Sequence, residues 1–316
     1  MYHHHRHDPL FRYFLLFLVA VPLLSPASSS TTQTTTSAHG TLTISTTDNV
    51  TIVTICNPPI NLYDLKLSTD VFYFLTSLDP ANRTTPPPKV VIFRSADPHF
   101  FIPHIDVNLF IPQFPPLDPA KIALGNTYTA TTSLLQSLTA TVFIGEVDGE
   151  ASGAGNELLV QMDMRFAGPN AKVSSLETSL GVTHGSGGMQ FLGRLIGKGR
   201  ALQYLLSGDY ADCKLGKELG WFNDCYESRE ELEDKVGALA KKIGLRPQAA
   251  LNATKAGLQS MNPPLSVLQA DLNNFIPLAN SPAAQALLHK LLVLGKNQTR
   301  SPFELGMPET IGELYE

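Results

Sequence analysis

The sequence contains little charge, few cysteines and no basic cluster. Charged residues make up 16% of its 316 residues and the net charge is −5, which argues against a general nucleic-acid-binding protein. Three cysteines are too few for a disulfide scaffold: Cys213 and Cys225 are able to pair and leave Cys56 free, but buried thiols are an equally good interpretation. The chain is nevertheless 43% hydrophobic, which is enough for one large domain with its own core.

Several motifs that bind cofactors or activate a nucleophile are missing or incomplete. Gly-x-Gly begins at Gly153, Gly185 and Gly197, but none of the three continues to the last glycine of a dinucleotide fingerprint. No Gly-x-Ser-x-Gly elbow marks a hydrolase serine. No cluster of His, Cys and Asp has metal-ligand spacing, and no internal repeat has a solenoid period. We therefore expect no metal and no separate cofactor.

The N-terminal segment has the composition of a targeting sequence. His- and Arg-rich residues 1–8 precede an apolar run over residues 10–24, and small residues follow over 25–30. This order is typical of a cleaved secretory signal, and the run is short for a membrane-spanning helix. An uncleaved signal anchor, organelle targeting and an incorrect gene start are the alternatives. We expect a signal peptide or signal anchor over residues 1–27 and a disordered Ser/Thr-rich linker over residues 28–39.

The signal interpretation predicts a location in the secretory pathway or outside the cell. An anchor or a transit sequence would instead place the protein on a membrane or in an organelle. Asn-x-Ser/Thr sequons agree with the secretory route, although such sequons often arise by chance. They stand at Asn49, Asn82, Asn252 and Asn297.

From residue 40 onward the hydrophobic pattern alternates between strands and helices. Polar and apolar β-branched residues alternate over residues 41–45 and 50–55, which predicts two half-buried strands. Nearly all-apolar runs over residues 89–94 and 141–147 are typical of strands covered on both faces in a parallel sheet. This alternation indicates β-α-β units and an α/β fold. Helices are predicted over residues 62–78, 127–138, 157–164, 200–207, 214–219 and 230–243, with proline-interrupted helix from residue 262.

Two glutamates lie in glycine-rich turns near the middle of the chain. Glu157 ends the segment Gly-Glu-Ala-Ser-Gly-Ala-Gly-Asn-Glu, and twenty positions later Glu177 opens Glu-Thr-Ser-Leu-Gly-Val-Thr-His-Gly-Ser-Gly-Gly-Met-Gln. Glycines let the backbone approach a ligand and present its N–H groups. Two carboxyl groups beside such donors are the components of acid/base chemistry next to a developing oxyanion. Taken singly, Glu157 also fits a helix N-terminus, and Glu177 fits an ordinary surface position.

These blocks together resemble the crotonase superfamily, the enoyl-CoA hydratase/isomerase family. A strand, a Phe-x-x-x-x-Asp loop over residues 101–106, a helix, a strand and the two glycine–glutamate segments follow in that family's order, and the likeness covers residues 40–259. The resemblance implies a fold of repeated β-β-α turns that form two nearly perpendicular sheets. It also implies a catalytic domain over residues 40–260 and a helical packing or oligomerisation region over residues 261–316. Since the family usually forms trimers or dimers of trimers, we expect a homotrimer or hexamer.

The resemblance also assigns site residues. In hydratases of this family two glutamates hold and activate a water for addition to an α,β-unsaturated thioester, and Glu157 and Glu177 occupy both positions. Two peptide N–H groups form the oxyanion hole, and their positions fall on Ala154 and Pro103. The remaining residues expected to contact the substrate are Phe101, His104, Asp106 and Gly153.

Pro103 is the point where the sequence departs from the family pattern, because proline has no N–H to donate. Loss of one oxyanion donor costs about 10²–10³ in rate. Three outcomes are open: the His104 N–H replaces the missing donor, activity is weakened, or the reaction needs no complete hole.

The resemblance thus predicts an enoyl-CoA hydratase/isomerase-like enzyme that acts on an acyl-CoA or a related carbonyl compound. Its only cofactor would be the coenzyme A of the substrate, and we expect no nucleic-acid partner. The alternatives are a weakened or inactive crotonase-fold binding protein, and a dehydratase or cyclase that acts on a non-CoA substrate in the secretory pathway.

Overall fold

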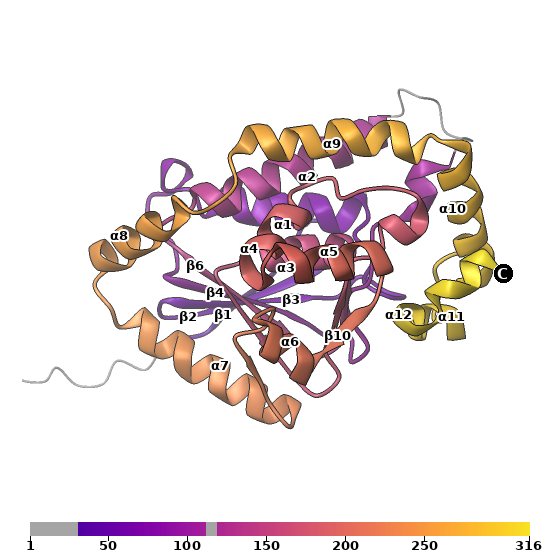
Figure 1. Cartoon of the computed structure of the whole chain (residues 1–316). Coiled ribbons are helices and arrows are strands. Elements are labelled where there is room, and N and C mark those ends of the chain that lie inside the picture. The colour runs from indigo at the N-terminus through magenta and orange to yellow at the C-terminus, as the bar shows by residue number, and fades with distance from the viewer. Residues whose placement is uncertain (1–30, 112–118) are drawn as a thin grey trace, which may run out of the picture. The chain divides into compact units, whose positions relative to one another are not determined.

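Two β-sheets form the framework of the protein in the computed structural model, which describes residues 31–111 and 119–316 (Figure 1). The larger sheet has seven strands in the order β1-β2-β3-β4-β6-β8-β11. Neighbours from β3 to β11 are parallel. At the other edge, β1 pairs antiparallel with β2, and β2 pairs antiparallel with β3. The strands are β1 (Gln33–Thr36), β2 (Leu42–Thr47), β3 (Val50–Ile55), β4 (Val90–Ser95), β6 (Val142–Val147), β8 (Met164–Ala167) and β11 (Asp224–Cys225).

Both faces of the larger sheet are covered, as the apolar runs predict. In β4, Val90 and Ile92 belong to the core beneath α7 (Arg229–Gly244). The alternate residues Val91 and Phe93 belong to the core beneath α1 (Leu65–Ser77). All four side chains are fully buried, because successive residues of a strand point to opposite faces and each face has its own helical cover.

The smaller sheet carries the turn that leads into the candidate site. Its order is β10-β9-β7-β5, with β5, β7 and β9 parallel and β10 antiparallel. Immediately after β7 the chain turns at Gly153 and begins helix α3. The α/β fold class is confirmed. The strands are β5 (Phe100–Ile102), β7 (Glu150–Ser152), β9 (Lys172–Ser174) and β10 (Tyr210–Asp212).

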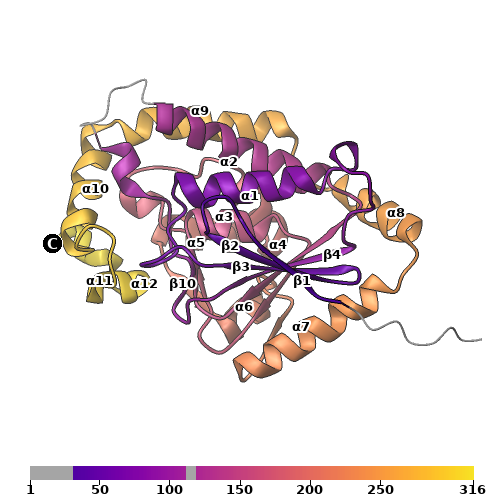
Figure 2. The same ribbon diagram turned by 180° about the vertical axis from the view of Figure 1, so that it is seen from behind.

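Helices surround these sheets, and α9 lies along α2 in both views (Figures 1 and 2). The remaining α-helices are α2 (Pro119–Ser137), α3 (Ala154–Val160), α4 (Gly188–Ile196), α5 (Lys198–Ser207), α6 (Cys213–Leu219), α8 (Gln248–Gln259), α9 (Leu265–Ala279), α10 (Pro282–Leu294), α11 (Pro302–Leu305) and α12 (Met307–Thr310). Short 3₁₀ helices are η2 (Pro80–Asn82), η3 (Val107–Phe110), η4 (Thr178–Leu180) and η5 (Ile311–Tyr315).

The helical C-terminal region packs against its own chain. A separate apolar cluster joins Leu288 and Leu291 of α10 to Val107 of η3 and Leu180 of η4. The same cluster includes Phe303 of α11. The C-terminal helices therefore cover the two segments that follow β5 and β9, and the expected homotrimer or hexamer stays a prediction.

Part of the segment predicted as a disordered linker is an edge strand. β1 pairs with β2 from Gln33 to Thr36. Thr34 and Ser45 share a hydrogen bond between their hydroxyl groups at 3.0 Å. The exposed, wholly polar strand has no alternation for a sequence pattern to detect, and it is held through backbone pairing and hydroxyl contacts instead.

Two further boundaries differ from the predicted ones. Phe100–Ile102 forms the strand β5 rather than the start of a loop, because it pairs with β7 in the second sheet. Helix α3 begins at Ala154, earlier than the predicted residue 157, and ends at Val160. Gly153 adopts a φ of 49°, which turns the chain directly from β7 into the helix.

The signal peptide or anchor predicted over residues 1–27 lies outside the described residues. Within the ranges 31–111 and 119–316, no helix has both the length and the apolar character needed to cross a membrane.

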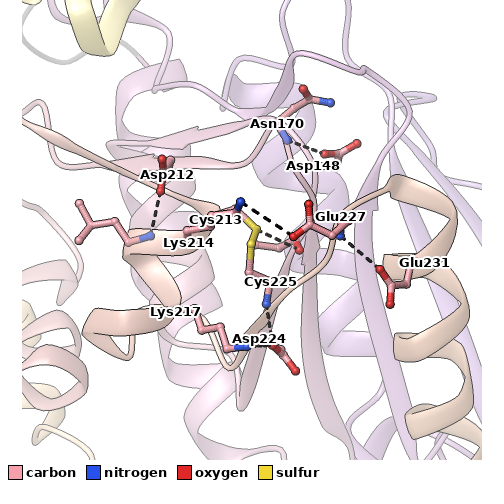
Figure 3. The surroundings of a disulfide bond; sticks show 12 residues. Asp148, Asn170, Asp212, Cys213, Lys214, Lys217, Asp224, Cys225, Glu227 and Glu231 are labelled. Atoms are coloured by element: carbon pink, nitrogen blue, oxygen red, sulfur yellow. Dashed lines mark hydrogen bonds and ion pairs between the residues drawn. A yellow bond between two sulfur atoms is a disulfide. The ribbon is translucent and has the colours of Figure 1, made fainter.

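Cys213 and Cys225 form a disulfide (Figure 3). Of the two interpretations, the pairing is confirmed and the buried free thiols are not. The bond links the first residue of α6 to the edge strand β11 across a sequence separation of 12. Beside it Lys217 Nζ lies 2.6 Å from Asp224 Oδ1. Cys56 is free and exposed.

Removal of this disulfide is expected to lower the free energy of unfolding by about 3 kcal/mol, the value for a loop of roughly 15 residues. The Cys213→Ser/Cys225→Ser double variant and the oxidised wild-type protein would be compared by urea denaturation. Cys56→Ser serves as the matched control and leaves the midpoint unchanged, because Cys56 is unpaired. Equal midpoints for the double variant and the wild type would contradict a stabilising bond.

Candidate active site

A cavity of about 510 Å³ lies between the turn at Gly153, helices α2 and α9, and the segment that contains Glu177. Glu157, Ala154 and His104 also line it. Five of the eight predicted site residues therefore meet in one cavity. Its other lining residues are Ile105, Val107, Leu109, Phe110, Leu124, Gly125, Asn126, Tyr128, Leu176, Leu180, Val182, Thr183, Gly185, Leu272, Phe275, Ile276, Ala279, Asn280 and Leu288.

Glu157 stands in the first turn of α3 and is held by three donors. Its Oε1 accepts hydrogen bonds from the backbone N–H groups of Ser186, at 3.0 Å, and Gly188, at 2.9 Å. Its Oε2 accepts a hydrogen bond of 2.5 Å from the Tyr128 hydroxyl. Glycine is required at position 188, because an added Cβ would stand 2.6 Å from Glu157 Cγ. The glycine-rich turn thus brings backbone donors onto a buried carboxyl group.

Burial raises the pKa of Glu157, and the charge of Glu177 adds to this, while His184 and the donors of Tyr128 and Gly188 oppose it. Burial and the neighbouring Glu157 charge also raise the pKa of Tyr128 well above its usual value. Tyr128 therefore keeps its proton and remains a hydrogen-bond donor. Glu157 takes up a proton more readily than an exposed glutamate.

Glu177 lies just before η4 and pairs with a buried histidine. Its Oε2 is 3.1 Å from His184 Nε2. The other carboxylate oxygen, Oε1, lies beside the cavity wall at Gly153, where an added Cβ would stand 3.6 Å from it. One oxygen is thus paired and the other faces the turn that opens α3.

His184 is only 1% exposed. Burial lowers its pKa, but the carboxylates of Glu177, Glu157 and Asp271 outweigh burial and raise it to about 9. His184 and Tyr128 were not among the predicted site residues. His184 stands inside the glycine segment that Glu177 opens, which was an available signal, whereas nothing in the sequence connects Tyr128 with Glu157.

The loop after β5 contributes a backbone donor and a second buried histidine. Among the described residues, the backbone N–H groups of His104 and Ala154 have no hydrogen-bond acceptor. His104 Cβ lies beside Gly153, 3.8 Å from an added Cβ there. Pro103 occupies the position expected to donate, and the unpaired N–H is one residue further along.

The His104 ring is fixed from both sides. Its Nδ1 lies 2.8 Å from the Ile105 carbonyl oxygen, and its Nε2 lies 3.0 Å from Glu304 Oε2 of α11. Burial lowers the pKa of His104, but Glu304 outweighs this and the net shift is upward. Both ring nitrogens face oxygen atoms, an arrangement that favours the protonated form of the ring. Glu304 is two hundred residues away in sequence and gave no sequence signal.

Phe101 and Asp106, which were predicted to contact substrate, are not among the described lining residues. Phe101 is fully buried in the main core. Asp106 begins η3, where its Oδ1 accepts hydrogen bonds from Asn108 N at 3.0 Å and Gln298 Nε2 at 2.7 Å. Phe101 packs in the core and Asp106 holds the loop through hydrogen bonds, and neither lines the cavity.

The described residues also contain no group of three or more His, Cys, Asp or Glu side chains placed to hold a metal ion. The described polar side chains that line the cavity are those of Glu157, Glu177, Tyr128, His104, Asn126, Thr183 and Asn280.

The fold and the paired glutamates define a crotonase-fold protein. The chain belongs to the enoyl-CoA hydratase/isomerase family, whose profile matches residues 45–284. A solved structure provisionally named as an enoyl-CoA hydratase from Streptomyces avermitilis is 29% identical, with a TM-score of 0.79 over 89% of this chain and 98% of that one.

Two curated relatives match over shorter stretches. Crotonyl-CoA hydratase of Syntrophomonas wolfei subsp. wolfei is 38% identical over 113 residues, 36% of this chain and 43% of the relative. The 2,3-dehydroadipyl-CoA hydratase of Escherichia coli (strain K12) is 36% identical over 116 residues, 37% of this chain and 45% of the relative. The chain thus spans less than half the length of these two relatives.

Proposed function

We propose that this protein adds water to an α,β-unsaturated acyl thioester, or removes it in the reverse direction. The observation that carries the proposal is that Glu157 and Glu177 line one cavity together with Ala154, the first residue of α3. The family relationship supports an acyl-CoA substrate, since the relatives are named as hydratases of acyl-CoA compounds.

The surroundings of the two carboxyl groups suggest different roles for them. Glu177 is paired with a cationic histidine and acts as the base, taking a proton from water while the water oxygen bonds to the β-carbon of the substrate. The electron pair of the double bond moves to the thioester oxygen. Glu157 then gives its proton to the α-carbon. A proton passes from Glu177 back to Glu157 before the next turnover.

The hydrogen bonds of Glu157 support one position for its proton. Oε1 already accepts the N–H groups of Ser186 and Gly188, whereas Oε2 accepts only the Tyr128 hydroxyl. A carboxyl oxygen has two lone-pair directions, so the proton of the neutral acid sits on Oε2. Tyr128, which lines the cavity, orients that oxygen.

The thioester oxygen would be held by the N–H groups of Ala154 and His104. Both lack acceptors in the described protein, and both residues line the cavity. Ala154 also stands at the N-terminus of α3, where negative charge is favoured. In this proposal the donor missing at Pro103 is replaced by its neighbour.

Most of the remaining cavity wall is apolar and suits an acyl chain, although Asn126, Thr183 and Asn280 also line it. Each buried methylene contributes about 0.8 kcal/mol, so kcat/KM for hydration should rise roughly fourfold per added methylene until the cavity is filled. The measurement is kcat/KM over 2-enoyl-CoA substrates of increasing length, from crotonyl-CoA upward. Absence of turnover with every member of the series would overturn the proposed function. Turnover without dependence on length would reject only the acyl pocket.

The location and the oligomeric state stay predictions. The secretory route would be supported by glycosylation of the exposed Asn82 in the native host. A homotrimer or hexamer would be recognised from the mass of the purified protein in solution.

A further inference from the structure

We propose that His184 is a positioning residue that holds Glu177 as the ionised member of the carboxyl pair. The inference rests on the proposed function and on the 3.1 Å approach of His184 Nε2 to Glu177 Oε2. Both partners are buried, with side chains 2% and 11% exposed. An ion pair shielded from solvent in this way is screened little by water or salt.

One turn organises both carboxyl groups. Residues 184–188 place the His184 ring against Glu177, while the backbone N–H groups of Ser186 and Gly188 hold Glu157 Oε1. Gly188 leaves room for the ring, since an added Cβ would stand 2.5 Å from His184 Cδ2. The turn therefore gives Glu177 a full positive charge and gives Glu157 only neutral donors. This asymmetry separates the base from the acid.

Acidic groups face His184 from three elements of the fold. Glu177 precedes η4, Glu157 belongs to α3, and Asp271 comes from the C-terminal helix α9. Asp271 is itself held by Gln190 Nε2 at 3.0 Å. Two tyrosines are also present: Tyr128 of α2 donates a hydrogen bond to Glu157, and the ring of buried Tyr63 lies 5.4 Å from that of Tyr128.

Because these carboxylates raise the pKa of His184 to about 9, its ring is cationic throughout the neutral pH range. The His184 cation lies 3.1 Å from Glu177 Oε2, which favours the negative charge of the pair on Glu177. Burial raises the pKa of Glu157, which favours its protonated form. If His184 acted only through packing, its replacement by a neutral side chain would not change which of the two glutamates is ionised.

The test is the pH profile of kcat/KM for crotonyl-CoA hydration by His184→Gln. Glutamine retains a hydrogen-bond donor but has no charge, so the acidic limb should move upward by about one pH unit, the low end of the effect of a close opposite charge. Wild-type activity should also fall as the pH rises through about 9, where His184 loses its proton, and this fall should be absent from the variant. The matched control is His289→Gln, an exposed histidine of α10 whose replacement leaves the profile unchanged.

A uniform loss of activity in His184→Gln without movement of either limb would overturn the inference. The ion pair is also tested without activity, by NMR titration of the His184 ring in wild type and in Glu177→Gln. We expect the ring to titrate near pH 9 in wild type and at least one unit lower in the variant. An unchanged titration would refute the pairing. Absence of turnover in wild type with the expected titration would refute the proposed reaction alone.

Discussion

Replacement of Glu177 by glutamine is expected to lower kcat for enoyl-CoA hydration by about 10²–10⁴-fold, the usual contribution of a positioned general base. Glutamine keeps the shape of the side chain but cannot take a proton from water. The KM should change little, because in this proposal Glu177 meets the substrate only through the water that adds to the β-carbon. Steady-state kinetics of the purified full chain measure both constants.

Glu157→Gln should give a loss of similar size for the opposite reason, since the amide has no acidic proton for the α-carbon. The double variant should be little worse than either single variant, because residues that act as a unit have non-additive effects.

Glu150→Gln is the matched control. This glutamate is equally buried, but it is not among the described cavity residues, and burial raises its pKa to about 8. It is therefore mostly neutral at pH 7, and glutamine resembles its neutral form. Unchanged turnover in both Glu157→Gln and Glu177→Gln would remove the proposed acid/base pair.

Local pattern was sufficient for most of the framework. The apolar run at 89–94 predicted β4 as a strand covered on both faces, and Val90 and Val91 are indeed buried under different helices. The strands β7 and β9 went unpredicted, because three residues are too few to show the period of a strand in the sequence. Edge strand β1 was missed for a related reason: its Thr-rich composition is shared with disordered linkers.

The same limit applies to the site. Glu157 and Glu177 could be found from the sequence because the glycines that mark each turn lie within a few residues of the glutamate. Their partners were not, since Tyr128 comes from α2 and Glu304 from α11, and only the fold brings these helices to the turn. The protonation state of a buried group depends on partners that are distant in the sequence. Whether a carboxyl group is an acid or a base therefore has to be inferred from the structure.

The oxyanion proposal makes the second large prediction. His104→Pro removes the backbone N–H, and its kcat should fall about 10²–10³-fold below that of His104→Ala, which keeps it. Both variants lose the imidazole and leave Glu304, which is fully buried, without its partner. Their comparison therefore isolates the N–H from the ring, provided that thermal denaturation shows both to be folded.

Pro103→Ala supplies the complementary measurement, because it restores an N–H at the position where the family pattern has one. If His104 already donates, Pro103→Ala should change kcat little in the wild-type background and should recover part of the loss in the His104→Pro background. Equal rates for His104→Pro and His104→Ala, together with a large gain for Pro103→Ala alone, would contradict the proposal that the His104 N–H takes the place of the donor missing at Pro103. Such a result would show that the hole has one donor and that the enzyme works with a weakened oxyanion site, because Ala154 alone would then carry the developing charge.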